Sequence, residues 1–351
     1  MLKRKELLTT AALALVMLMT ACGGQKEDVP DDSANGSINE ISLNDNNKED
    51  PDDEENDELQ KPDEAKRINV KAAVVGDCTG IGFAPIMGWG EKDKNHEKYE
   101  LSVKATADEA AAELESGAAD VAILPLDKAV RMYNDGKDIV LLATNTYNNI
   151  YIADLSSIGT EKSALAGQTV VYVNDGSLTA SVAEKILEKA GAQAQSAESG
   201  DSLQAALESS SVKLAVTSEP YITRAKMQND NIELGPDVKE LWADVDGSEI
   251  ISSVLVARGS FVKDNADSMI YIMDDFRQSV NTVIYGVTKT LEYSSKFNIV
   301  ADKSEAISSM KNCNFTFTEG EDMKRAVQSF LGANSAVFGD KLPDDGFYYI
   351  G

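Results

Sequence analysis

The chain has 351 residues, a hydrophobic fraction of 42% and a formal net charge of −26 at neutral pH. So acidic a chain argues against a nucleic acid partner, because binding to phosphates requires a basic surface. The single histidine, His96, lies in a run of charged residues typical of a solvated loop, so neither a Cys-His catalytic pair nor a metal site is expected.

The first residues predict export. Basic residues at positions 3–5 precede an uncharged apolar run over 7–19, which is too short to span a bilayer and is typical of a signal peptide covering 1–21. The run ends in Met19-Thr20-Ala21-Cys22, which resembles a bacterial lipobox. That resemblance implies cleavage before Cys22 and lipidation of its side chain, which would anchor the mature chain extracytoplasmically to the outer face of the plasma membrane. The alternative is an ordinary signal peptide followed by an incidental cysteine.

A lipid-anchored, acidic, disordered linker is predicted over 22–67. From residue 25 onward this stretch is dominated by Asp, Glu, Asn, Pro and Ser, with too few large apolar residues to offset the entropy of ordering. Its negative charges repel one another and should extend it as a tether. No later apolar run reaches about 18 residues, so no membrane-spanning helix is expected.

The folded part begins with a strand, a glycine-rich turn and a helix. Residues 68–75 have the pattern of a buried strand, and the turn from Thr79 to Pro85 leads into a helix. A second strand is predicted over 99–105, then a helix over 108–116 that stops at Gly117, and a short strand over 121–124.

This order of elements occurs twice. A strand over 170–173 leads through a turn at Ser177 into a helix over 178–190, and a helix from Asp201 leads into a strand at 214–216. In both copies an aspartate precedes a Leu-Glu-Ser triplet by six residues, and an apolar triplet begins seven residues after the leucine. Strands alternating with helices predict two α/β lobes, each with a mostly parallel sheet flanked by helices on both faces.

The lobe boundaries follow from the two copies. Lobe 1 is predicted to comprise 68–148 and 256–351, and lobe 2 to comprise 149–255. Crossings near 145–152 and 252–258 would form a hinge. A long amphipathic helix is expected over about 265–285, and the helical remainder should pack against lobe 1.

Several stretches together resemble the solute-binding proteins of ABC importers, of the nitrate, sulfonate, taurine and thiamine-precursor type. They cover 79–85, 116–125, Asn145-Thr146, 218–221 and 341–349. The resemblance implies a two-lobed type II periplasmic-binding fold that closes on a small solute and delivers it to ABC permease and ATPase subunits. It also implies a monomer without cofactor, metal or catalytic activity.

Candidate ligand contacts lie at the carboxyl ends of the predicted strands and at the first crossing. Each has a plainer interpretation: a tight turn near residue 80, a helix cap at Ser177, support of hinge backbone by Asn145, or a helix start at Glu219. Trp89, Arg131 and Arg224 are assigned surface or packing roles. The predicted contacts are Thr79, Gly80, Ile81, Gly82, Phe83, Pro125, Asn145, Thr146, Tyr147, Ser177, Leu178, Thr179, Glu219 and Tyr221.

The ligand itself is left open. The binding turns contain no evident arginine, which favours a neutral, heteroaromatic or amine-bearing solute over a small oxyanion, and the Glu219 carboxylate would suit a cation. Cys78 and Cys313 are equally compatible with a disulfide and with two free thiols. A surface or sensing lipoprotein, and an enzyme on the same fold, remain as alternative functions.

Overall fold

The computed structural model describes residues 68–90 and 97–351. The predicted signal peptide, the lipidation site Cys22, the acidic linker and the loop containing His96 lie outside the described residues. Within these two ranges, no helix combines the length and the apolar character that crossing a bilayer requires.

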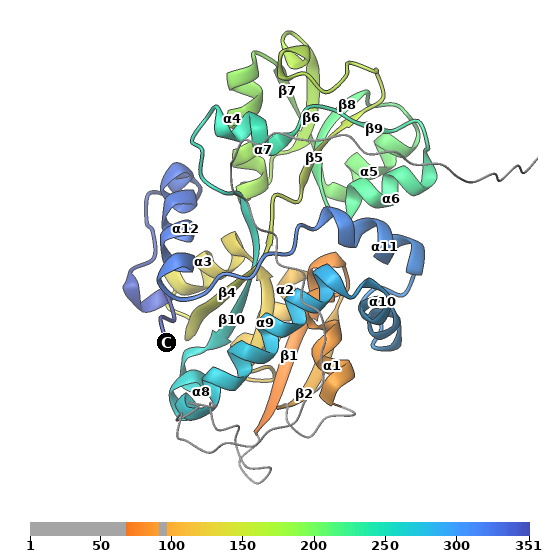
Figure 1. Ribbon diagram of the computed structural model, residues 1–351. Coiled ribbons are helices and arrows are strands. Elements are labelled where there is room, and N and C mark those ends of the chain that lie inside the picture. Colours follow the sequence, from red (N-terminus) through yellow and green to blue (C-terminus); the bar gives the residue numbers. More distant parts are fainter. Residues whose placement is uncertain (1–67, 91–96) are drawn as a thin grey trace, which may run out of the picture. The chain divides into compact units, whose positions relative to one another are not determined.

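The first of two five-stranded sheets has the order β2-β1-β3-β10-β4 (Figure 1). Strand β1 pairs in parallel with β2 and β3, whereas β10 is antiparallel to both β3 and β4. The sheet therefore has four strands pointing one way and one reversed strand. Its strands are β1 (Asn69–Val75), β2 (Lys98–Lys104), β3 (Val121–Pro125), β4 (Ile139–Tyr147) and β10 (Ile251–Arg258).

Helices cover both faces of this sheet. Successive residues of β1 point to opposite sides, so Ala73 joins a core cluster with Leu114 of α2, whereas Val74 joins a second cluster with Phe276 of α9. The helices are α1 (Ala84–Gly90), α2 (Ala107–Ser116), α3 (Leu126–Asn134), α8 (Gly259–Asp264), α9 (Met269–Tyr285) and α10 (Val287–Lys296), with 3-10 turns η2 (Cys78–Phe83) and η4 (Ala266–Ser268).

The second sheet repeats this arrangement, with the order β7-β6-β8-β5-β9. Three parallel strands again adjoin one reversed strand, since β6 is parallel to β7 and β8 while β5 is antiparallel to β8 and β9. The expected duplication and the two-sheet α/β fold are thereby confirmed. The elements are β5 (Ile150–Asp154), η3 (Lys162–Leu165), β6 (Thr169–Val173), α4 (Leu178–Ala190), β7 (Gln193–Ala197), α5 (Gly200–Glu208), β8 (Leu214–Ser218), α6 (Tyr221–Gln228), β9 (Glu233–Leu234) and α7 (Val238–Ala243).

Local capping explains where the predicted helices begin and end. The Thr106 hydroxyl accepts a hydrogen bond from the backbone of Glu109 at the start of α2, and Gly117 closes that helix in the left-handed conformation at φ 79°. Helix α4 has the same devices in Ser177 and Gly191, the latter at φ 69°. Both helix ends lie where the sequence predicts them.

The connections between the sheets differ in part from expectation. The first lies at residues 148–149, between β4 and β5, inside the predicted crossing. Strand β10 pairs from Ile251 onward with strands of the first sheet, so the return to that sheet lies before Ile251 rather than within 252–258. The predicted boundary after residue 255 thus falls inside a strand of the first sheet.

The sequence predicts that the C-terminal helices pack against lobe 1, but they also contact helices of the second sheet. Glu305 of α11 pairs with Arg224 of α6 at 2.7 Å. The side chain of Asn334, which follows α12, accepts a hydrogen bond from Ser181 of α4 at 2.8 Å. Both helices therefore bridge to the second sheet. The C-terminal elements are α11 (Lys303–Asn312), α12 (Gly320–Ala333), η5 (Ser335–Phe338) and η6 (Asp345–Phe347).

Cys78 and Cys313 form a disulfide with a Cα–Cα distance of 6.4 Å, which resolves the alternative that the sequence left open. The bond joins the beginning of η2, directly after β1, to the end of α11. It therefore links the glycine-rich turn of the first sheet to a helix that also contacts the second.

Candidate functional site

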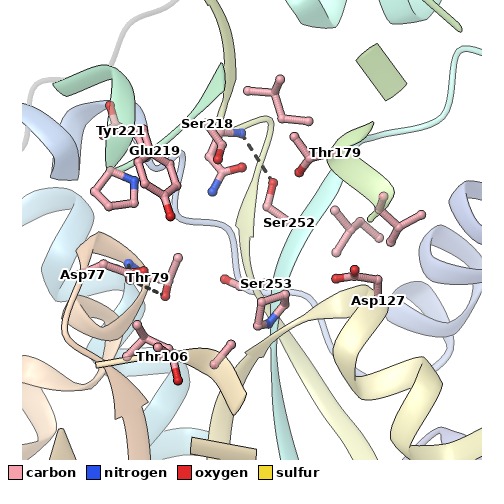
Figure 2. A pocket seen from close by; sticks show the side chains of 18 of the residues that line it. Asp77, Thr79, Thr106, Asp127, Thr179, Ser218, Glu219, Tyr221, Ser252 and Ser253 are labelled. Carbon is pink, nitrogen blue, oxygen red and sulfur yellow. Dashed lines mark hydrogen bonds between the residues drawn. The ribbon is translucent and has the colours of Figure 1, made fainter. Parts of the chain in front are cut away.

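A cleft of about 330 Å³ lies where the carboxyl ends of strands from both sheets meet, which is the usual ligand position in open α/β sheets. Its size is at the low end for small-molecule sites. Figure 2 shows side chains from both sheets surrounding this space. The residues that line it include Asp77, Thr79, Thr106, Pro125, Asp127, Asn149, Leu178, Thr179, Glu219, Tyr221, Arg224, Ser252 and Ser253.

The turn after β1 forms part of the first wall. The Asp77 carboxylate caps η2 by accepting hydrogen bonds from the backbone N–H of Thr79 at 2.8 Å and from its hydroxyl at 2.7 Å. Gly80 is required behind this turn, because a Cβ there would lie 2.3 Å from the carbonyl oxygen of Val75. The capped, close-packed turn holds Thr79 at the cleft.

Beneath the cleft, a buried polar network joins β4 to β10. The Asn145 amide donates to the carbonyl of Thr79 at 2.9 Å and to the Ser253 hydroxyl at 3.0 Å, while Thr146 and Ser253 share a hydrogen bond of 2.6 Å. Asn145 and Thr146 are fully buried. They support the turn and the first crossing from behind and do not line the cleft.

The second wall begins at the start of α4. The Ser177 hydroxyl accepts a hydrogen bond from the backbone of Ala180 at 3.1 Å and so acts as the helix cap. Leu178 and Thr179 line the cleft itself, whereas Ser177 lines an adjoining hollow. The cap fixes the direction in which the first turn of α4 presents Thr179.

Glu219 lies at the end of β8 on the same wall, and only 5% of its surface is exposed. Its Oε1 accepts hydrogen bonds from the Thr223 hydroxyl at 2.8 Å and from the amide of Asn312 at 2.7 Å. No donor among the described residues reaches its buried Oε2. Burial raises the pKa of Glu219 from 4.5 to about 7, although hydrogen bonds from Asn312 and Thr223 oppose the shift.

Negative charge predominates around the cleft. Asp77, Asp127 and Glu219 line it, against Arg224 as the one lining residue with a cationic side chain. The Arg224 guanidinium pairs with Glu305, which partly neutralises it. Burial also raises the pKa of Asp77 and of Asp127 above the usual aspartate range.

The structure brings together part of the predicted site. Thr79, Pro125, Leu178, Thr179, Glu219 and Tyr221 line one cleft, although they come from four separate turns. Tyr147 lines a different hollow, with Tyr151 and Pro236. The turn residues that are buried behind the cleft wall are Gly80, Ile81, Gly82 and Phe83. Ligand contact by any of these residues stays a prediction.

Sequence reasoning missed several cleft residues. Asp77 and Thr106 cap helices, and Asp127 lies in the first turn of α3, so their sequence context indicates capping before ligand contact. A usable signal was present for Asp127, because it follows Pro125, which was itself a predicted contact. Asn149 and Ser252 enter the cleft only because the first crossing lies beside the start of β10, with 3.5 Å between the Asn149 nitrogen and the Ser252 hydroxyl.

In the part of the chain that the structure describes, no group of three or more His, Cys, Asp or Glu side chains is placed to hold a metal ion. The lining groups are hydroxyls, an amide, carboxylates, one guanidinium, one phenol, and aliphatic and aromatic surface. They are suited to hold a small polar molecule in one orientation.

Comparison with solved structures identifies the fold. An ABC transporter structure from Parabacteroides distasonis is 20% identical, with a TM-score of 0.65 over 80% of this chain and 98% of its own. The periplasmic aliphatic sulphonate binding protein of Escherichia coli is 15% identical, with a TM-score of 0.62 over 80% and 96%. The periplasmic nitrate-binding protein of Synechocystis is 14% identical, with a TM-score of 0.54 over 77% and 81%.

No family model matches the chain, and no curated protein matches it in sequence. At identities this low the structural likeness shows the fold, which is that of periplasmic binding proteins. The solved structures to which the chain is similar include substrate-binding components of ABC transporters, as the sequence motifs had predicted.

Proposed function

We propose that this chain is the extracytoplasmic solute-binding component of an ABC importer, which captures a small organic molecule and delivers it to a permease. The observation that carries the proposal is a cleft lined by strand ends of both sheets. A solute that touches both walls would favour the conformation in which the walls are close, and contacts to one wall alone would not.

The shared fold and the cleft chemistry both support binding rather than catalysis. The compared proteins are binding proteins and not enzymes. The cleft hydroxyls of Thr79, Ser252 and Ser253 have no histidine beside them among its lining residues, so the cleft lacks a hydroxyl nucleophile paired with a histidine base. We infer that the solute leaves unchanged.

The first experiment identifies the solute. The mature chain is purified in detergent, denatured, and the released small molecules are analysed by mass spectrometry, in parallel with a thermal-shift screen of small metabolites. We expect a recovered molecule or a raised unfolding temperature. No recovered molecule and no shift across the screen would refute the proposed function.

A second experiment separates import from sensing. Uptake of the identified solute is measured in cells with and without the chain, and we expect uptake to fall when the chain is absent. Retained uptake together with specific binding would instead identify a sensing or surface lipoprotein.

Membrane attachment is tested by Cys22→Ser. Because two acyl chains on Cys22 would supply the anchor, the variant is expected to leave the membrane fraction. A variant that stays membrane-bound would exclude this anchor.

A further inference from the structure

The Glu219 carboxylate has a buried oxygen without a hydrogen-bond partner among the described residues. Both donors that reach it, Thr223 and Asn312, bond to Oε1, and the buried Oε2 has no partner within the described residues. Arg224 is nearby in sequence, but its Nε bonds to Glu305. A buried carboxylate without a cation is costly, so its presence at a ligand cleft calls for a ligand that compensates it.

The opposite wall presents two more carboxylates. Asp127 lies at the start of α3, after β3, and Asp77 lies in the turn after β1. Both belong to the first sheet, whereas Glu219 belongs to the second. Figure 2 shows Asp77 below Glu219 and Tyr221, and Asp127 at the other end of the same wall, below Thr179. A positive charge in this space would be attracted to both walls at once.

An anionic solute would meet the reverse situation. The cleft offers one arginine, whose Nε is paired with Glu305, and none of its lining residues is a lysine. Recognition of a sulfonate or carboxylate normally uses an unpaired arginine fork or several backbone donors. Three carboxylates around about 330 Å³ would repel such a group.

Resting on the proposed function, we infer that the solute is a small organic cation, an amine or quaternary ammonium compound. Its charge would lie between Glu219 on one wall and Asp77 and Asp127 on the other, and the Tyr221 ring would be available for a cation–π contact. Because the charge interacts with both walls, the same group would provide affinity and draw the two walls together.

The binding test compares matched probes on the full mature chain. Calorimetry and thermal shift are measured with ammonium compounds (choline, ethanolamine, putrescine), with the neutral carbon isostere of choline, and with ethanesulfonate and nitrate. We expect a cation to bind, with the neutral isostere at least about tenfold weaker. Tightest binding by a neutral or anionic probe would overturn the inference and leave the proposed function intact. Failure of every cationic probe would likewise overturn the inference, and the proposed function would fall as well only if the metabolite screen and the search for a co-purified molecule also found nothing.

Glu219→Gln keeps the shape of the side chain and removes the charge, and Asp127→Asn does the same on the opposite wall. Each substitution is expected to lower the affinity for the cation by at least about tenfold, because a charge-assisted contact is lost. The matched control is Glu233→Gln, which removes an exposed carboxylate from β9 of the same sheet and should leave affinity unchanged. Unaltered affinity in both cleft variants would overturn the inference.

Affinity for a quaternary ammonium probe should also depend on pH. Because the probe itself does not titrate, any pH dependence comes from groups of the protein. The titratable or charged groups near Glu219 are Tyr151 on β5, Tyr221 and Arg224 on α6, and Glu305 on α11. Burial raises the tyrosine pKa values further, so the tyrosines stay neutral between pH 6 and 8, whereas Glu219, whose pKa burial raises to about 7, changes charge in this range. We expect roughly tenfold weaker binding at pH 6 than at pH 8, and a flat profile in Glu219→Gln. A flat wild-type profile would contradict the role of Glu219.

Discussion

Replacing Glu219 by glutamine should stabilise the protein in the absence of solute. The change keeps the size of the side chain and an oxygen that can accept hydrogen bonds from Thr223 and Asn312. It removes a carboxylate whose Oε2 is buried without a partner. The folded protein thus no longer has to hold a desolvated charge.

The size of the effect follows from the pKa of Glu219, which burial raises from 4.5 to about 7. Below the lower value the carboxyl is protonated in both the folded and the unfolded chain. As the pH rises through this window, the unfolded chain loses a proton that the folded chain retains, so the stabilising contribution of the protonated form is lost. The full loss is about 3 kcal/mol once the pH exceeds the folded pKa.

The assay is urea unfolding of wild type and Glu219→Gln at several pH values from 5 to 8, in the absence of ligand. Trp242 provides the fluorescence signal, because it is buried and packs on Phe330 with ring centroids 5.9 Å apart. Taking the difference between the two proteins cancels groups that titrate in both. We expect the variant's advantage to grow by about 2 to 3 kcal/mol between pH 5 and pH 8.

The stability difference between wild type and Glu219→Gln at pH 8 is the deciding measurement. At pH 8 the variant should also melt about 5 °C higher, given the unfolding entropy of a domain of this size. Glu233→Gln, the exposed control, should follow the wild-type profile. Parallel wild-type and Glu219→Gln profiles, or a less stable variant at pH 8, would show that the Glu219 carboxylate carries no desolvation cost.

Two further predictions concern the turn after β1. Replacing Cys78 and Cys313 by serine should lower the free energy of unfolding by about 2 to 5 kcal/mol, because the bond closes a loop with a sequence separation of 235; an unchanged urea midpoint would contradict this. Gly80→Ala should destabilise by about 1 to 3 kcal/mol, since its Cβ would lie 2.3 Å from the carbonyl oxygen of Val75. Gly332→Ala, with open space and an exposed helical position, should stabilise by up to about 1 kcal/mol. Equal melting temperatures of Gly80→Ala and Gly332→Ala would contradict the steric explanation.

The repeated core of the fold could be predicted because its strands are buried and its helices carry local stop signals. Val170 to Val173 reads as a strand, and Gly117 and Gly191 end their helices where the sequence indicates. The edge strand β7 could not be found in this way, because Gln193–Ala197 has no apolar alternation and is largely exposed. Pairing with β6, and not its own composition, makes it a strand.

The candidate site was less predictable, because its geometry depends on contacts far apart in the sequence. Asn145 and Thr146 have the polar character of ligand contacts, yet both bond to Ser253, more than one hundred residues away, and are buried by that pairing. Asp127 is in the cleft because β3 ends there. The local sequence does not show which of these polar side chains is buried and which lines the cleft, because the neighbouring strand decides whether a polar side chain is buried.

The end of α11 connects the two walls of the cleft, in addition to the connections between the strands. Asn312 donates to Glu219 on the second wall, and the next residue, Cys313, is bonded to Cys78 at the turn of the first wall. One short segment therefore fixes the first wall covalently and orients a carboxylate of the second by a hydrogen bond. Because the Asn312 amide and the Thr223 hydroxyl both bond to Oε1, the buried Oε2 is the oxygen of this carboxylate without a partner. A cation that binds there would relieve the buried charge without displacing the connection between the walls.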